Sequence, residues 1–162
     1  MKEISDVLII LTSTGVPWDR EKVYQEFMDN YKSLNEEDKI NYKCKNSLEL
    51  GYFCNHVDII ISGGVSKGYK QPFYDGNSHV YIFQNYGNGT SFGHFKINFD
   101  ESNGFFTGFD YEVVNSISQT LFLNDFDYDE DAHKWIKNKS SSAIESIYKP
   151  IDWNSFQNIK EI

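Results

Sequence analysis

Between residues 57 and 111, short apolar runs alternate with clusters of turn-forming residues, and this alternation restricts the folds open to the chain. The expected strands cover residues 57–61, 79–84, 92–99 and 105–111, with β texture beginning near residue 47. Gly, Asn and Asp dominate the breaks between these runs, and they favour tight turns. We therefore predict an antiparallel β-meander of about four to six strands.

The first third of the chain carries helical periodicity. Val23, Phe27 and Tyr31 recur at helical spacing after Asp19, a residue type that caps helix N-termini. Residues 35–38 mark a turn or the start of another short helical piece. In residues 4–11, apolar side chains at positions i, i+3, i+4 and i+7 favour a short helix. The β-branched content of the same segment also permits a buried strand.

The last third is also predicted to be helical. Val113, Val114, Ile117 and Leu121 have helical spacing, and a further helix carries Trp135 and ends before Pro150. Helices from the N- and C-terminal thirds packed on an antiparallel sheet form an α+β fold. Because no Pro-, Gly- or Ser-rich linker divides the chain, we predict that residues 1–162 form a single domain.

The net charge of the chain limits the classes of partner that it can bind. It has 24 Asp and Glu residues against 15 Lys and Arg, which gives a net charge of −9. Such a surface repels nucleic acid and anionic membranes and favours a basic protein or a metal ion, although acidity also serves solubility alone. The longest apolar run, Val7 to Leu11, is too short to span a membrane, and the N-terminus does not resemble a signal peptide. A cytoplasmic location is therefore expected.

An acidic run interleaved with aromatic residues is the candidate partner-binding site. It consists of Asp125, Phe126, Asp127, Tyr128, Asp129, Glu130 and Asp131. Alternate carboxylates suggest a calcium loop, but such a loop needs Gly at its sixth position and Glu at its twelfth. Glu130 and Ile136 occupy those two positions, so calcium is not expected.

Two interpretations of this acidic run stay open. In an extended conformation, its Asp side chains would face one way and its aromatic side chains the other, which makes a recognition edge for a basic partner. Alternatively, residues 129–131 form only the favourable acidic first turn of the helix that carries Trp135.

No other motif completes a catalytic or metal site. Gly63 and Gly68 have the spacing of a phosphate loop, but Tyr69 follows where Lys is required. Cys54 and His56 lack further ligands or a third catalytic group. We therefore expect no enzymatic activity, cofactor or metal.

These observations together predict an acidic inhibitor that binds a basic protein. One concrete form is an immunity protein or antitoxin that neutralises a nuclease toxin by blocking its cationic site. The alternative is a small-molecule-binding domain or enzyme with an aromatic-lined pocket. The aromatic residues expected to line that pocket are Tyr69, Phe73, Tyr74, Tyr86 and Phe92.

Overall fold

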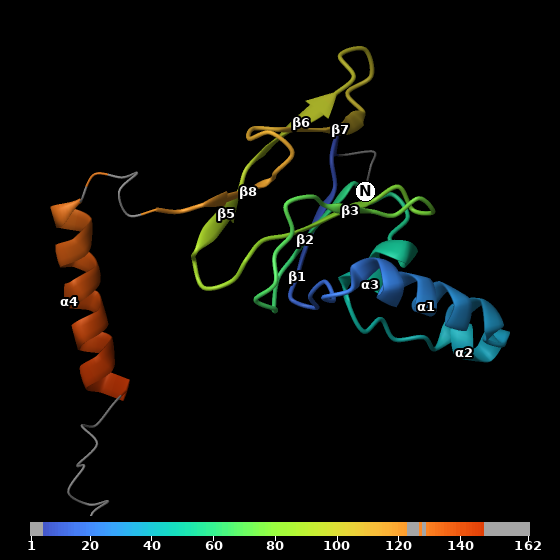
Figure 1. Cartoon of the computed structure of the whole chain (residues 1–162), viewed down its shortest axis with the longest axis horizontal. Helices are drawn as coiled ribbons and strands as arrows, with labels where there is room; N and C mark the ends of the chain where they lie inside the picture. The colour runs from blue at the N-terminus through green and yellow to red at the C-terminus, as the bar shows by residue number, and fades with distance from the viewer. Residues whose placement is uncertain (1–4, 123–126, 128, 148–162) are drawn as a thin grey trace, which may run out of the picture. The chain divides into compact units, whose positions relative to one another are not determined.

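The computed structural model describes residues 5–122, 127 and 129–147. The chain divides into two compact units, residues 1–121 and 122–162, and each is described by itself. The first unit contains β1 (Ile9–Thr12), α1 (Arg20–Ser33), α2 (Glu36–Ile40), α3 (Ser47–Phe53), β2 (Ile59–Ser62), β3 (Phe73–Tyr74), β4 (Tyr81–Gln84), β5 (Ser91–Gly93), β6 (Phe95–Phe99), β7 (Phe106–Tyr111) and β8 (Ser118–Thr120) (Figure 1). The second unit contains α4 (Glu130–Ile147). The prediction that residues 1–162 form a single domain stays a prediction.

The central sheet has the strand order β1-β2-β4-β3, in which β1, β2 and β4 are parallel and β3 is antiparallel to β4. Ile10, Ile60 and Ile82 lie side by side across the three parallel strands. Parallel neighbours need a crossover connection, and α1, α2 and α3 supply it between β1 and β2. The mixed helix-and-strand composition agrees with the prediction. The simple meander is wrong, because apolar runs alone do not distinguish parallel from antiparallel pairing.

The segment over residues 4–11 ends in a strand, so the predicted helix there is wrong. Leu8 and Ile10 pack on the side of the sheet that carries the helices. Ile9 pairs with Ile59 in the parallel ladder and is half-exposed at the edge of the sheet. Apolar residues on both faces of a strand can imitate helical spacing, and tertiary pairing decides between the two.

Two other segments also differ from the prediction. Residues 47–53 form α3 instead of the start of the β region, because the Asn46 side chain caps the helix by accepting from the amides of Leu48 and Glu49. Residues 113–121 form a tight turn and β8 instead of a helix. The amide of Ser116 donates to the carbonyl of Val113 there, and β8 pairs antiparallel with β5.

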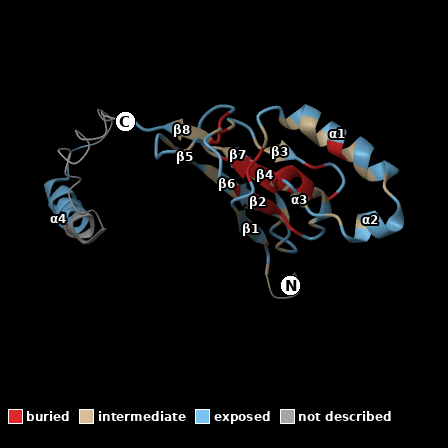
Figure 2. Cartoon of the chain, turned by 90° about the horizontal axis from the view of Figure 1, so that it is seen from below, coloured by how far each residue is buried: buried red, intermediate tan, exposed pale blue. Residues whose placement is uncertain are grey.

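The sheet has an apolar layer on each face. On the helix side, α3 packs directly against β2 and β4, and the buried residues are Val16, Leu48, Val57, Ile60, Val80 and Ile82. On the opposite side, the β6–β7 hairpin brings Phe95 into parallel stacking with Phe83, with ring centroids 4.3 Å apart. Figure 2 shows the buried residues concentrated in β2, β4 and α3. This arrangement leaves one side of α1 and most of α2 exposed to solvent.

The other predicted elements agree with the structure. α1 begins after Asp19 and buries Phe27, and α2 follows Asn35, whose side chain accepts from the amide of Asp38. Strands overlap each of the four expected ranges. In the second unit, α4 contains Trp135, as predicted, whereas Pro150 lies outside the described residues. Within the part of the chain that the structure describes, no helix combines the length and hydrophobicity needed to cross a membrane.

Candidate functional site

The carboxyl ends of the parallel strands meet at one edge of the sheet, which is where α/β proteins commonly bind ligands. Here the edge holds a chain of hydrogen-bonded polar groups. The hydroxyl oxygens of Thr14 and Ser47 are 2.8 Å apart, and those of Ser47 and Ser62 are 2.7 Å apart. Ser62 then donates to Gln84 Oε1 at 3.0 Å, and the same oxygen accepts from the amide of Val16 at 2.6 Å. These groups are hydrogen-bond partners of one another, so this series of hydrogen bonds holds the loops together.

Glycine residues allow the loops at this edge to pack backbone against backbone. Gly64 has φ +86°, and a Cβ placed there would lie 2.0 Å from the carbonyl oxygen of Ser13. A Cβ on Gly68 would lie 2.3 Å from the amide nitrogen of Tyr86. Only glycine allows such close approaches of backbone to backbone. At Gly64 and Gly68 the segment therefore lies against neighbouring backbone, while residues 64–66 remain exposed to solvent.

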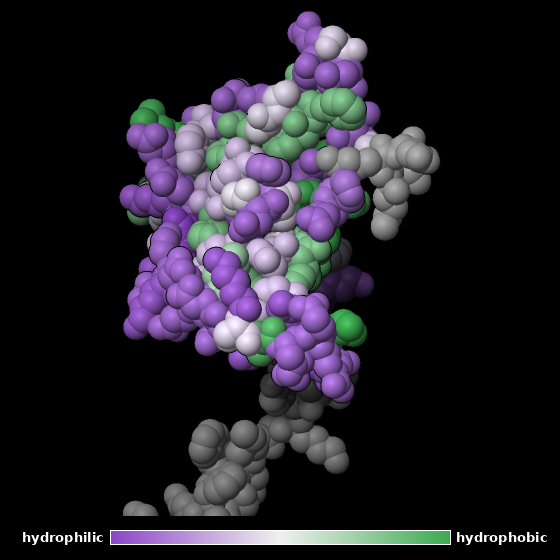
Figure 3. Space-filling model, turned by 90° about the vertical axis from the view of Figure 1, so that its right-hand side faces the viewer, coloured by the Kyte–Doolittle hydropathy of each residue, from purple (hydrophilic) through white to green (hydrophobic). Residues whose placement is uncertain are grey.

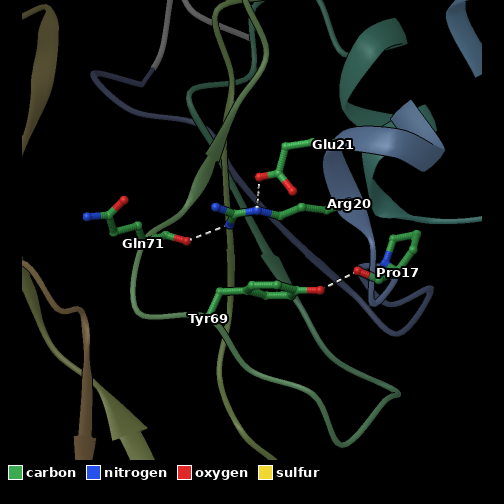
Figure 4. A network of polar contacts seen from close by, with 5 residues as sticks. All are labelled: Pro17, Arg20, Glu21, Tyr69 and Gln71. Atoms are coloured by element: carbon green, nitrogen blue, oxygen red, sulfur yellow. Dashed lines mark hydrogen bonds and ion pairs between the residues drawn. The ribbon is translucent and has the colours of Figure 1, made fainter. Parts of the chain in front are cut away.

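Beside these loops, Arg20 is held in a network of polar contacts (Figure 4). Its guanidinium carbon lies 4.6 Å from the centre of the Tyr69 ring. Its Nε donates to Glu21 at 2.6 Å, and a terminal nitrogen donates to the carbonyl of Gln71 at 2.7 Å, while the Tyr69 hydroxyl donates to the carbonyl of Pro17. Through the bond to Gln71 and the stacking on Tyr69, Arg20 joins α1 to the loop before β3.

The aromatic residues named for a pocket do not converge. Tyr69 stacks against Arg20, and Phe73 belongs to the helix-side core. Tyr74 packs against Tyr81, with ring centroids 4.8 Å apart. The remaining two, Tyr86 and Phe92, are exposed. The alternative function therefore lacks the lining that we expected for it.

A groove of about 480 Å³ lies elsewhere, between α1 and the segment that leads into α3. Its volume is within the range typical of ligand sites. The lining residues are Val23, Glu26, Phe27, Asn30 and Ser33 from α1, Leu34 at its C-cap, and Tyr42, Lys45, Asn46 and Glu49 from the opposite wall. Figure 3 looks at the side of the first unit that carries α1 and α2, and hydrophilic residues cover most of that face.

Glu49 is the unusual residue of the groove, because it carries a carboxylate and is only 4% exposed. Its carboxylate accepts from the Tyr42 hydroxyl at 3.1 Å and from the side-chain amide of Asn46 at 3.0 Å. It also accepts from the backbone amide of Lys45 at 2.7 Å. Among the described residues, no Lys or Arg side chain lies within ion-pair distance of this carboxylate.

Burial and the Glu49 carboxylate raise the pKa values of the two neighbouring groups, Tyr42 and Cys44. Burial, followed by the hydrogen bond to Glu49, raises the pKa of Tyr42 to about 12, so the phenol keeps the proton that it donates. Burial also raises the pKa of the Cys44 thiol, with a smaller contribution from Glu49. Cys44 is free and half-buried, and its thiol stays protonated at neutral pH.

Sequence reasoning missed this groove, although a signal for it was present. Asn46 and Glu49 have the spacing of a capping box, in which the cap side chain binds the amide three residues on and the Glu reaches back to the helix start. The structure shows the first half, whereas the Glu49 carboxylate accepts from the side-chain amide of Asn46 instead of its backbone amide. The pattern would have indicated that α3 begins at this point and that Glu49 faces backwards.

The acidic run predicted to bind a partner is only partly described. Asp125, Phe126 and Tyr128 lie outside the described residues. Asp127, Asp129, Glu130 and Asp131 are exposed. Asp129 accepts from the amide of Ala132 at 2.8 Å, and Glu130 pairs with Lys134 at 3.3 Å. The run therefore supplies the start of α4, and a role in partner binding stays a prediction.

Cys54 and His56 do not form the strand pair that the sequence left open. Cys54 is the C-cap of α3, and His56 has φ 71°, so the two do not lie on a common strand. Among the described residues, no three His, Cys, Asp or Glu side chains converge to hold a metal ion. Comparison with known proteins gives no relative: no family model, no curated protein and no solved structure matches the chain.

Proposed function

We propose that this chain is a binding protein that inhibits a basic protein partner by covering its cationic site. An immunity protein or antitoxin against a nuclease toxin is the concrete form of this proposal. Nuclease sites are cationic because they bind phosphate, so a surface rich in carboxylates competes with the substrate for them. The chain acts by binding, not by catalysis.

The observation that carries the proposal is the concentration of acidic residues in residues 125–131. This segment has five acidic residues and no basic residue. One of the five, Glu130, pairs with Lys134 at 3.3 Å. The acidic run therefore gathers four further carboxylates within seven residues, a density that favours a basic partner.

The proposal is tested by capture from cells of the source at low salt, followed by titration with a nona-arginine peptide as a defined basic probe. The run variant carries Asp125→Asn, Asp127→Asn, Asp129→Asn, Glu130→Gln and Asp131→Asn. The matched control carries Asp29→Asn, Glu36→Gln, Glu37→Gln, Asp38→Asn and Glu101→Gln, which removes the same charge from the first unit.

The run variant should lose the partner and bind the peptide far more weakly, whereas the control should keep most of both. Affinity for the partner should fall as the Debye length shortens from about 30 Å at 0.01 M salt to about 8 Å at 0.15 M. Equal losses in the two variants, or a captured partner that is acidic, would refute the proposal.

One observation favours the alternative of a small-molecule-binding domain, namely the groove of about 480 Å³ between α1 and α3. Phe27 and Tyr42 give it aromatic walls, and Glu26, Asn30 and Glu49 give it polar groups. Binding of a neutral metabolite in this groove, with no dependence on salt, would support the alternative over the inhibitor.

A further inference from the structure

We propose that the groove between α1 and residues 42–49 receives a single basic side chain, an Arg or a Lys of a protein partner. The inference rests on the proposed function, because it assumes that the partner is a basic protein. It adds a site in the first unit that is separate in sequence from the acidic run.

The charges that line the groove favour a cation. Glu26 stands on the α1 wall and Glu49 on the opposite wall, and Lys45 is the only basic residue among the lining residues. Glu26 contacts Lys22 at 3.9 Å, which is a long pair between two exposed side chains and therefore costs little to exchange. An anionic ligand would face two carboxylates with one ammonium group to offset them.

Glu49 supplies the most specific argument. A buried carboxylate is costly unless it is paired and hydrogen-bonded, and Glu49 has its hydrogen bonds but no cation among the described residues. Its three donors are neutral and hold it at the groove. An incoming ammonium or guanidinium group would supply the missing opposite charge.

The aromatic lining fits the same ligand. Phe27 is buried and its ring centroid lies 5.8 Å from that of Tyr42, so the two rings form one apolar surface beside the carboxylates. Guanidinium groups stack on such rings, and the methylene stems of Arg and Lys pack against apolar walls. The groove therefore combines the carboxylate and the aromatic surface that a basic side chain needs.

The test uses a short peptide of four glycines around one central arginine, blocked at both ends. A second peptide carries citrulline in place of arginine, which keeps the shape of the side chain and removes its charge. Binding is measured by calorimetry at low salt to the whole chain and to three variants. The variants are Glu26→Gln and Glu49→Gln in the groove, and Glu37→Gln on α2 as the control.

Arginine should bind measurably and citrulline should not. Glu26→Gln should weaken the arginine peptide about fivefold and Glu49→Gln on the order of tenfold, because each removes one charge-assisted contact. Glu37→Gln should change nothing. Glu26 is exposed, so its variant tests the inference even if Glu49→Gln disturbs the fold.

Equal binding of arginine and citrulline, or equal affinity in Glu26→Gln and wild type, would overturn the inference. The variant of the acidic run separates this failure from failure of the proposed function. If the variant of the acidic run loses the partner while Glu26→Gln retains full affinity for partner and peptide, the proposal for the groove is wrong. The proposed function as an inhibitor then still holds. If no basic probe binds in either place, both proposals fall.

Discussion

Two buried carboxylates, Asp75 and Glu49, are held by the same kinds of donor in two different settings. Asp75 accepts from the Tyr24 hydroxyl at 2.6 Å and from the backbone amides of Asn77 and Ser78 at 2.7 and 3.1 Å. Glu49 likewise has a tyrosine hydroxyl, a backbone amide and a third nitrogen donor.

The two residues differ in what surrounds them. Asp75 is fully buried, in the turn between β3 and β4, and Tyr24 ties that turn to α1. Glu49 lines a groove that is open to solvent. The comparison teaches that the same hydrogen-bond pattern closes a turn in one place and holds a carboxylate at the wall of a groove in the other.

The largest effect on stability is expected from Asp75→Asn. The amide nitrogen of Asn cannot accept a hydrogen bond, so at least one buried donor loses its partner. Unsatisfied buried groups next to a former charge lower the free energy of unfolding by about 2–4 kcal/mol. Urea denaturation measures this loss, and calorimetry should show unchanged affinity for the arginine peptide. A loss of affinity in a folded Asp75→Asn protein would break the comparison.

Glu49→Gln should cost less stability, about 1–2 kcal/mol, because water can enter the groove and replace part of what is lost. Its main effect should be on binding, as predicted for the arginine peptide. Denaturation and titration of the same preparation give both quantities. A loss of stability equal to that of Asp75→Asn, with peptide affinity unchanged, would make Glu49 a second structural carboxylate and nothing more.

The two tyrosines predict a loss of stability at alkaline pH. Burial and the neighbouring carboxylates raise the pKa of both phenols, that of Tyr42 to about 12 and that of Tyr24 further. An unfolded tyrosine ionises near pH 10, so above that pH the unfolded chain has lost protons that the folded chain keeps. The free energy of unfolding therefore falls from about pH 10, and the contribution of Tyr42 is gone above about pH 12.

Urea midpoints between pH 8 and pH 11.5 check this prediction. Tyr42→Phe and Tyr24→Phe should each make the alkaline fall shallower, since each removes one titrating phenol. If both variants follow the wild-type curve, the phenols are not coupled to the carboxylates as described.

The smallest effect is expected at Ser78, beside Asp75. Its hydroxyl is buried and has no hydrogen-bond partner within the described part of the chain. Ser78→Ala removes that unsatisfied group and keeps the amide that binds Asp75, so stability should stay within about 0.5 kcal/mol of wild type or rise. Thermal unfolding measures the change. A clear destabilisation would mean that the turn is less closed than the comparison requires.

Sequence reasoning located the elements whose signals are local. Phe27 and its helical neighbours defined α1, and β2 was recognised from its β-branched run before Gly63. For β1 the helix was favoured over the strand that the sequence also permitted, because apolar residues occupy both faces and the segment has no period-2 alternation of polarity. Its parallel pairing to β2 depends on residues fifty positions away and leaves no local trace.

The candidate site was harder to predict than the fold. The charge excess at residues 125–131 is visible in the sequence, but the groove depends on how α1 and residues 42–49 come together. In the sequence, Glu49 looks like any surface glutamate. Its burial follows only from the packing of the folded chain. The capping-box spacing from Asn46 was the one available sign of its position.

The account is tested most directly by recording backbone amide NMR shifts of the whole chain during titration with the arginine peptide. It predicts saturable shifts at residues 26–34 and 42–49, none with the citrulline peptide, and unchanged amides around Asp75. Shifts that fail to saturate, or that are as large at residues 74–81 as in the groove, would contradict the claim that Glu49 is available to a basic side chain and Asp75 is not.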